Sequence, residues 1–156
     1  TSHYDAIVRF FRAKVTGPSD ELVQATFLAC AESLDRFRAD STFRAYLFGI
    51  ARFKLLEHLR AKARAAKIDP DFGVSCILDC DPGVSTVLAK STELRQLKLA
   101  LARLPVDTQT LLELHYWQEL SMNELACVFE TKPGTIKSRL FKARELLRAE
   151  IAKIEA

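Results

Sequence analysis

Apolar positions in the first part of the chain recur at intervals of three and four residues, the period of an amphipathic helix. The pattern predicts a helix from Asp20 to Phe37, which follows a break at Pro18-Ser19. A second helix is predicted from an N-cap at Ser41 to about Arg64. The apolar faces of the two helices are Val23, Phe27, Cys30, Leu34 and Phe37, and then Phe43, Tyr46, Leu47, Ile50, Leu55 and Leu59.

This periodicity fails from Ile68 to Val84, where prolines and glycines appear, and that loss predicts a linker. Beyond it, a leucine stripe from Leu94 to Leu104 predicts a helix that stops at Pro105, and another helix is predicted over Thr110 to Gln118. No segment is a convincing strand. The patterns predict an all-α protein with two small helical domains, residues 1–67 and 91–156, joined by a flexible acidic linker at 68–90.

The second domain contains a predicted helix-turn-helix. The stretch "SMNE" (Ser121 to Glu124) is a capping box, in which the serine side chain and the glutamate side chain each bond the other residue's backbone amide. The helix that it starts runs to about Phe129, a turn covers Glu130 to Lys132, and the next helix begins near Pro133.

The helix after this turn concentrates positive charge on one face. Ile136, Leu140, Ala143 and Leu147 have the spacing of an inward stripe, which turns outward Thr135, Ser138, Arg139 and Lys142. The outward set mixes groups that can reach base edges with groups suited to phosphates, as reading a DNA major groove requires.

Composition permits a packed core, and the charge is unevenly distributed. The chain has 156 residues, 49% of them hydrophobic, with a net charge of +3. Residues 43–67 hold seven basic residues against one acidic, 68–89 hold four aspartates and no basic residue, and 132–148 hold six basic residues against one acidic. Two basic blocks around an acidic one produce a field that a polyanion would feel.

Several features also have a purely structural interpretation. The stripe from Val23 to Phe37 is expected to be partly domain core, and about half of the aromatic residues at 43, 46, 48 and 53 are expected to pack rather than stack on bases. The basic face after residue 139 could be a solvated face. The linker aspartates could be ordinary solvated loop residues.

Nothing in the sequence indicates an enzyme. It has no glycine-rich phosphate loop, no nucleophile-histidine signature and no histidines at metal-ligand spacing, so no cofactor or metal is expected. Cys76 and Cys80 stand close together but lack the further ligands of a zinc site, and a redox role for them is a weak hypothesis. No membrane span or cleavable leader is expected, and the protein is predicted to be cytoplasmic.

Two long stretches resemble the extracytoplasmic-function (ECF) class of bacterial sigma factors. They are "DELVQATFLACAESLDRFRADSTFRAYLFGIARFKLLEHLR" (Asp20 to Arg60) and "LARLPVDTQTLLELHYWQELSMNELACVFETKPGTIKSRLFKARELLR" (Leu101 to Arg148). The resemblance implies sigma regions two and four joined by a linker, and a protein that directs core RNA polymerase to promoters. Implied partners are the β′ clamp and β flap of polymerase, promoter DNA and an anti-sigma factor.

The resemblance also assigns roles to residues. The minus-35 element would be read by Lys132, Pro133, Gly134, Thr135, Lys137, Ser138, Arg139, Lys142 and Arg144. The minus-10 element would be opened and read by Arg38, Ser41, Phe43, Arg44, Tyr46, Arg52, Phe53, Lys54, His58 and Arg60, where cations and flat rings suit unstacked bases. Core polymerase would be bound by Asp20, Glu21, Leu22, Val23, Gln24 and Phe27.

The sequence departs from the family pattern at three positions. Gly49 stands where an arginine is common, Phe53 where an asparagine is common, and Ala25 where a glutamate is common. An alternative interpretation is a stand-alone helix-turn-helix regulator whose first domain senses a ligand or dimerises. It predicts tight duplex binding without polymerase and gives the basic, aromatic segment at 43–67 no role. A helical module that binds only other proteins would bind neither DNA nor polymerase.

Overall fold

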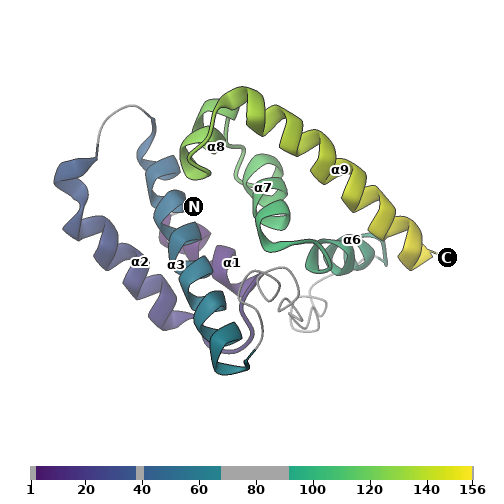
Figure 1. Ribbon diagram of the computed structural model, residues 1–156, viewed down its shortest axis with the longest axis horizontal. Helices are drawn as coiled ribbons and strands as arrows, with labels where there is room; N and C mark the ends of the chain where they lie inside the picture. The colour runs from purple at the N-terminus through teal and green to yellow at the C-terminus, as the bar shows by residue number, and fades with distance from the viewer. Residues whose placement is uncertain (1–2, 38–40, 68–91, 156) are drawn as a thin grey trace.

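The computed structural model describes residues 3–37, 41–67 and 92–155, and within these ranges it consists of helices joined by turns (Figure 1). The all-α prediction is confirmed. The predicted linker, Cys76, Cys80 and Arg38 lie outside the described residues. We call residues 3–67 the N-terminal unit and residues 92–155 the C-terminal unit.

The N-terminal unit is built from α1 (His3–Arg12), α2 (Asp20–Glu32), the short 3-10 helix η1 (Leu34–Arg36) and the long helix α3 (Phe43–Ala65). Helix α1 was not predicted, although Ile7, Phe10 and Phe11 on its inner face are buried. These residues pack with Leu47, Phe48 and Leu55 of α3 in one apolar cluster.

Two helix boundaries in this unit differ from the prediction. The α-helix that begins at Asp20 ends at Glu32 instead of reaching Phe37, because the hydroxyl of Ser33 donates to the carbonyl of Ala29 at 2.8 Å and the chain continues as η1. The N-cap of α3 is Thr42, not Ser41, since the Thr42 hydroxyl accepts a hydrogen bond from the amide of Ala45 at 3.2 Å.

The C-terminal unit comprises α6 (Thr92–Ala102), α7 (Val106–Tyr116), α8 (Met122–Val128) and α9 (Pro133–Glu155). Pro105 ends the α6 stripe as predicted, but α7 begins directly after it rather than at Thr110. The earlier start brings Val106 into the core. Helix α9 packs across α6, α7 and α8, so a single long helix closes this unit (Figure 1).

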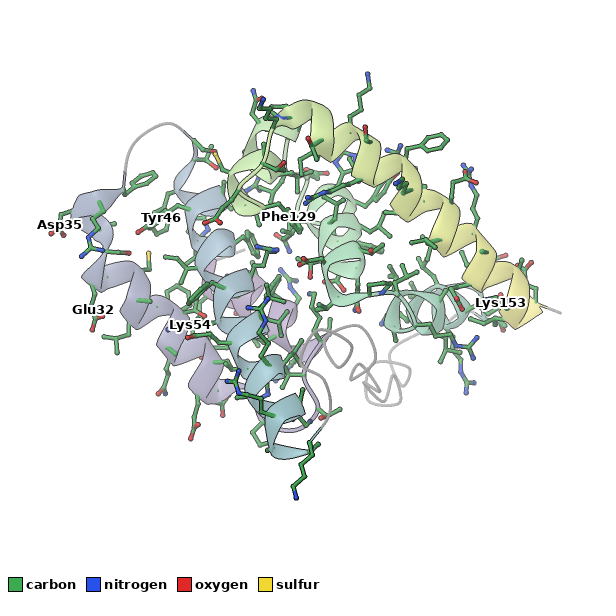
Figure 2. The ribbon with its side chains drawn as sticks, viewed as in Figure 1. Glu32, Asp35, Tyr46, Lys54, Phe129 and Lys153 are labelled. Carbon is green, nitrogen blue, oxygen red and sulfur yellow. The ribbon has the colours of Figure 1, made fainter. Side chains whose placement is uncertain are left out.

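The two units lie against each other through α3 and α8. Their buried residues form one continuous apolar cluster. At Gly49 on α3, an added Cβ would lie 3.9 Å from the Cα of Val128 on α8, so the α8 backbone passes close to α3 there. The labelled ring of Phe129, at the end of α8, lies near this junction (Figure 2).

Candidate nucleic-acid interface

The helix-turn-helix forms where it was predicted, from α8 and α9. Both hydrogen bonds of the capping box are present: the Ser121 hydroxyl accepts from the Glu124 amide at 3.1 Å, and the Glu124 carboxylate accepts from the Ser121 amide at 3.0 Å. Helix α8 ends when Glu130 takes a positive φ of 52° and the Thr131 amide donates back to Ala126 at 2.9 Å. These local bonds fix the angle at which α9 leaves the turn.

Helix α9 has the two faces that its sequence predicted. Ile136, Leu140 and Ala143 are buried against α8 and the rest of the unit, and Leu147 is half-buried. The opposite face carries polar and basic groups that are exposed to solvent, namely Lys132, Pro133, Gly134, Thr135, Lys137, Ser138, Arg139 and Lys142. Among the described residues, no carboxylate lies within ion-pairing distance of the four basic residues of this set.

Arg144 is the member of the predicted minus-35 set whose side chain is only partly exposed to solvent. Its Nε donates to the Tyr116 hydroxyl at 2.6 Å, and its guanidinium lies 5.7 Å from the centre of the Tyr116 ring. This residue is therefore held against α7, at the edge of the exposed face.

Of the aromatic residues predicted for the minus-10 set, some pack against other rings and one is exposed to solvent. Phe48, named beside them in the sequence, is 1% exposed and belongs to the core. Phe43 and Tyr46 pack on the ring of Phe37, and the Tyr46 hydroxyl also donates to the carbonyl of Ser33 at 3.1 Å. Phe53, by contrast, is 58% exposed.

Three of the six cations of α3 are in ion pairs with carboxylates. Arg52 donates to both carboxylate oxygens of Asp107 at 2.9 Å, Arg44 lies 3.7 Å from Glu124, and Lys54 lies 3.5 Å from Glu57 on its own helix. Arg60 is exposed.

His58, also on α3, is half-buried. Burial, together with the charge of Lys62, lowers its pKa below the ordinary value. The lowered pKa favours the neutral imidazole over the cation.

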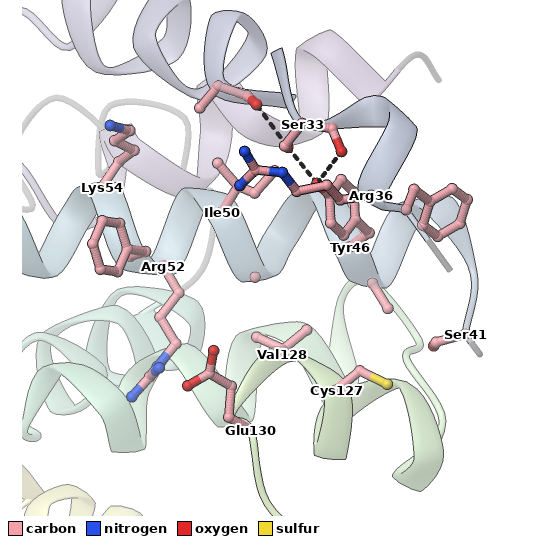
Figure 3. Close-up of a pocket in the computed structure, with 15 residues that line it drawn as sticks. Ser33, Arg36, Ser41, Tyr46, Ile50, Arg52, Lys54, Cys127, Val128 and Glu130 are labelled. Carbon is pink, nitrogen blue, oxygen red and sulfur yellow. Dashed lines mark hydrogen bonds between the residues drawn. The ribbon is translucent and has the colours of Figure 1, made fainter. Parts of the chain in front are cut away.

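A groove of about 560 Å³ lies between the end of α2, α3 and α8 (Figure 3). Its walls include Tyr46, Ile50 and Phe53 from α3, with Ser41 at one end. Arg36, Arg52 and Lys54 bring positive charge to the lining and Glu130 brings one carboxylate, so the groove combines flat apolar surface with a majority of cations. The far wall is formed by α8, from Cys127 and Val128.

The predicted polymerase-binding residues are split along α2. Val23 is buried at 2% exposure and is a core residue, while Leu22 and Phe27 are half-buried. Asp20, Glu21 and Gln24 are exposed. The structure adds two exposed apolar residues that the sequence analysis did not assign to this face, Leu28 at 61% and Leu34 at 51%. For Leu28 the available signal was an apolar residue on the outer side of an amphipathic helix. Leu34 was instead predicted on the apolar face, and it is exposed because the α-helix ends at Glu32.

Within 3–37, 41–67 and 92–155, no three of the histidine, cysteine and acidic side chains gather as a metal ion would require. In the same ranges, none of the helices has both the length and the apolar content that crossing a bilayer needs.

Family comparisons cover both units. Residues 1–65 match the family model for sigma-70 region 2, and residues 94–147 match the model for sigma-70 region 4. The ECF RNA polymerase sigma-E factor of Salmonella typhimurium is 30% identical over 142 residues, covering 85% of this chain and 73% of that protein. The RNA polymerase sigma-H factor of Pseudomonas aeruginosa is 26% identical, covering 92% and 83%.

Solved structures agree with these relatives. The sigma factor RpoE from Bartonella quintana, solved with the anti-sigma factor NepR, matches with a TM-score of 0.70 and 25% identity over 99% of this chain and 94% of that one. CnrH, solved with the cytosolic domain of CnrY, has the same fold, with a TM-score of 0.65 at 24% identity over 97% and 83% of the two chains. The two regions, their order and their helix-turn-helix agree in sequence and structure, and this chain belongs to the ECF family of RNA polymerase sigma factors.

Proposed function

We propose that this sigma factor divides promoter recognition between its two units, with α9 reading the minus-35 element as duplex. The main support for this proposal is the exposed face of α9, where four cations lie beside Thr135 and Ser138. Among the described residues, no carboxylate lies within ion-pairing distance of these four cations. Arg139 is suited to bidentate contact with a guanine edge, and Lys142 to a phosphate.

The N-terminal unit binds the opened strand of the minus-10 element. The groove beside α3 supports this role, because Phe53 offers an exposed ring and Lys54 and Arg36 offer positive charge within one concave surface. Single-stranded DNA is held by such combinations of stacking surface and cations. Phe43 and Tyr46 pack against the ring of Phe37. Their role is to hold the wall of the groove in place, and they do not stack on bases.

Helix α2 supplies the surface for core polymerase. Leu28 is exposed on α2 and Leu34 on η1, which follows it, and the acidic residues Glu32 and Asp35 are exposed in the same two elements. Apolar groups rimmed by charge are the usual composition of a protein-binding patch. Polymerase forms the phosphodiester bonds, so this chain is a non-catalytic subunit that works in the cytoplasm with that enzyme.

An anti-sigma factor is a further proposed partner. RpoE was solved with the anti-sigma factor NepR bound and CnrH with the cytosolic domain of CnrY bound, and both structures match nearly the whole of this chain. The stand-alone regulator is the weaker explanation, because residues 1–65 match sigma-70 region 2, which such a regulator does not need.

The test is transcription in vitro by bacterial core RNA polymerase on a pooled library of promoter fragments, with and without this protein. Initiation that depends on the protein and shares an upstream and a downstream motif supports the proposal. Tight duplex binding without any effect on polymerase would support the stand-alone regulator instead.

A further inference from the structure

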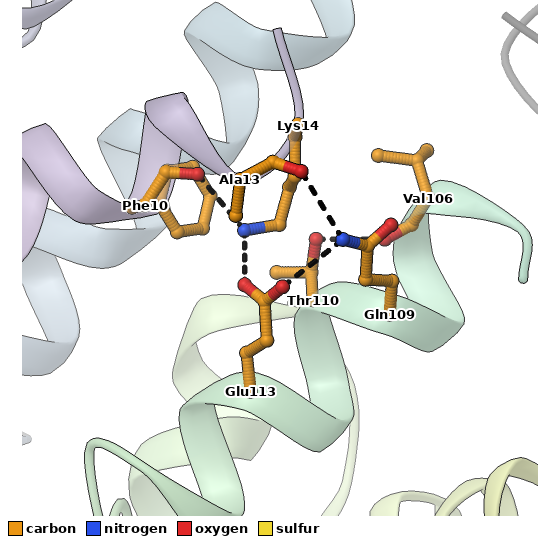
Figure 4. A network of polar contacts seen from close by, with 7 residues as sticks. All are labelled: Phe10, Ala13, Lys14, Val106, Gln109, Thr110 and Glu113. Carbon is orange, nitrogen blue, oxygen red and sulfur yellow. Dashed lines mark hydrogen bonds and ion pairs between the residues drawn. The ribbon is translucent and has the colours of Figure 1, made fainter. Parts of the chain in front are cut away.

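Some cations of this chain are held in place by carboxylates. Lys14 is fully buried, pairs with the carboxylate of Glu113 and donates to the carbonyl of Phe10 at 3.0 Å (Figure 4). Arg52 donates to both carboxylate oxygens of Asp107 at 2.9 Å. A carboxylate orders the cation that it binds and also compensates its charge, so less positive charge is left to attract another anion.

Arg144 on α9 is held by a neutral side chain instead. Its Nε donates to the Tyr116 hydroxyl at 2.6 Å, and its guanidinium lies 5.7 Å from the centre of the same ring. Across the part of the chain that the structure describes, no carboxylate lies within ion-pairing distance of Arg144. Tyr116 therefore orders the guanidinium through a hydrogen bond and its ring, while the positive charge stays uncompensated.

Tyr116 is itself fixed in position, because it is the last residue of α7. In the turn that follows, the amide of Leu120 donates back to the carbonyl of Leu114 at 3.0 Å. The ring of His115 meets the ring of Tyr116 edge-on, with the two centres 4.8 Å apart. Tyr116 is nevertheless 50% exposed, so its pair with Arg144 lies at the surface of the C-terminal unit.

Arg144 is placed for the DNA backbone rather than for base edges. It follows Pro133, the first residue of α9, by eleven positions, which is roughly 16 Å along a helix axis. In helices that enter a major groove, the first turns contact bases and later turns contact the backbone. Lys137 is exposed on the same side of α9, because residues seven positions apart differ by only about 20° around a helix. The two cations form one flank of the predicted minus-35 face.

We propose that Tyr116 is a positioning residue for minus-35 recognition, which holds Arg144 charged and ordered to bind a phosphate of the upstream duplex. The proposal rests on the proposed function of α9. A freely rotating arginine loses rotamer freedom when it binds a ligand, and that loss weakens binding. Tyr116 removes part of this freedom before DNA arrives. Because the phenol is a neutral acceptor, it does so without competing for the charge that attracts the phosphate.

The experiment measures the binding of polymerase holoenzyme, reconstituted with the full chain, to two labelled promoter duplexes. One carries the upstream element recovered from the transcription assay, and in the other that element is scrambled. Fluorescence anisotropy titrations at several KCl concentrations give the affinity and its salt slope. The variants are Tyr116→Phe, which removes the hydroxyl and keeps the ring, Arg144→Ala, and the two combined. Tyr4→Phe is the matched control, because Tyr4 is an exposed tyrosine of the other unit.

Tyr116→Phe should weaken binding about threefold on both duplexes, since a phosphate contact carries no sequence information. Its salt slope should equal that of the wild type, because no charge has been removed. Arg144→Ala should weaken binding further and reduce the salt slope by about 1. The combined variant should bind as Arg144→Ala does, because Tyr116 acts through that arginine. Tyr4→Phe should match the wild type.

Three results would overturn the proposal. The first is a Tyr116→Phe variant that binds as tightly as the wild type. The second is a further loss when Tyr116→Phe is added to Arg144→Ala, because a purely structural role of Tyr116 would weaken binding with or without the arginine. The third is an Arg144→Ala variant whose salt slope is unchanged.

The same titrations separate this failure from failure of the proposed function. If the wild-type holoenzyme prefers the recovered upstream element while Arg144→Ala keeps the wild-type salt slope, the phosphate contact is wrong and base reading by α9 stands. If the wild-type holoenzyme does not distinguish the two duplexes, the proposed function of α9 is rejected and this proposal with it.

Discussion

The two basic helices of the molecule have similar charge but opposite surroundings. On α9 the cations Lys137, Arg139 and Lys142 are exposed beside small polar residues, and no carboxylate of the described residues lies within ion-pairing distance of them. On α3 the cations Arg44 and Arg52 point to the other unit and meet Glu124 and Asp107. Sequence charge alone therefore does not tell which basic surface is available to DNA.

The difference has a geometric origin. Helix α9 buries one stripe against a single unit, which leaves its outer face for a ligand. Helix α3 is covered on one side by α1 and α2 and on another by α8, so less of it is left exposed. A helix at the junction of two units has its surface shared among neighbours, and less of that surface is free to meet a ligand.

The largest expected effect comes from two aromatic residues on α3 that differ only in exposure. Phe48→Ala should lower the free energy of unfolding by about 3–5 kcal/mol, because the ring is buried against α1. Phe53→Ala should change it by less than about 0.5 kcal/mol, since the ring is exposed. Urea unfolding measures both values.

The same pair should reverse its order in strand binding. Phe53→Ala is expected to lose about 1–3 kcal/mol of binding to single-stranded DNA in the presence of polymerase, through the lost stacking surface. If Phe53→Ala binds as the wild type does, the groove beside α3 is not the strand site.

Next in size is base reading by α9. Arg139→Ala should cost about 1–3 kcal/mol on cognate upstream duplex and relax sequence preference at one position, if its guanidinium reads a base. Gel-shift titrations with polymerase holoenzyme on cognate and scrambled upstream DNA give both numbers. Arg148→Ala, a charge-matched change on the same helix outside the predicted set, is the control.

Lys142 should behave differently from Arg139, because a phosphate contact carries no sequence information. Lys142→Ala is expected to weaken binding to cognate and scrambled duplex alike and to reduce the salt slope of log affinity by about 1. Equal losses from both variants on both DNAs would remove the distinction between base and phosphate contacts on α9.

The smallest effect concerns pH and the carboxylate of Glu124. Burial would raise its pKa, but hydrogen bonds from Thr42 and Ser121 and the charge of Arg44 together hold the pKa below the ordinary value. Because the folded-state pKa is lowered, the stabilisation is present above the ordinary carboxyl pKa and is lost as pH falls through the lowered one.

Glu124→Gln should therefore reduce thermal stability at neutral pH by more than it does near pH 4, as measured by scanning calorimetry. A difference between wild type and variant that stays constant over this range would show that the charge of Glu124 contributes nothing. Ser121→Ala separates the capping role from the contact with α3, because it leaves Thr42 and Arg44 in place.

Features that depend on neighbouring residues were predictable from the sequence. The capping box, the proline at the start of α9 and the inward stripe at Ile136, Leu140 and Ala143 all came from local spacing, and the structure confirms them. Helix α1 could have been found too, since Ile7, Phe10 and Phe11 have helical spacing. The Thr42 cap was missed because Ser41 is an equally good capping residue one position earlier.

Features that depend on distant residues were not predictable. Arg52 and Asp107 are separated by 55 positions, and Lys14 and Glu113 by 99. No periodicity links such pairs. The unusual Gly49 was noted as a departure from the family, but its physical meaning, the close passage of α8, required the arrangement of both units.

The ion pair between Arg52 and Asp107 should make the contact between the two units sensitive to ionic strength. Salt screens an exposed pair of this kind, over a Debye length of about 10 Å at 0.1 M, and so favours separation of the units. Salt also weakens DNA binding by reducing the entropy gained from released counterions. Raising the salt concentration should therefore loosen the contact between α3 and α7 and weaken binding to DNA at the same time.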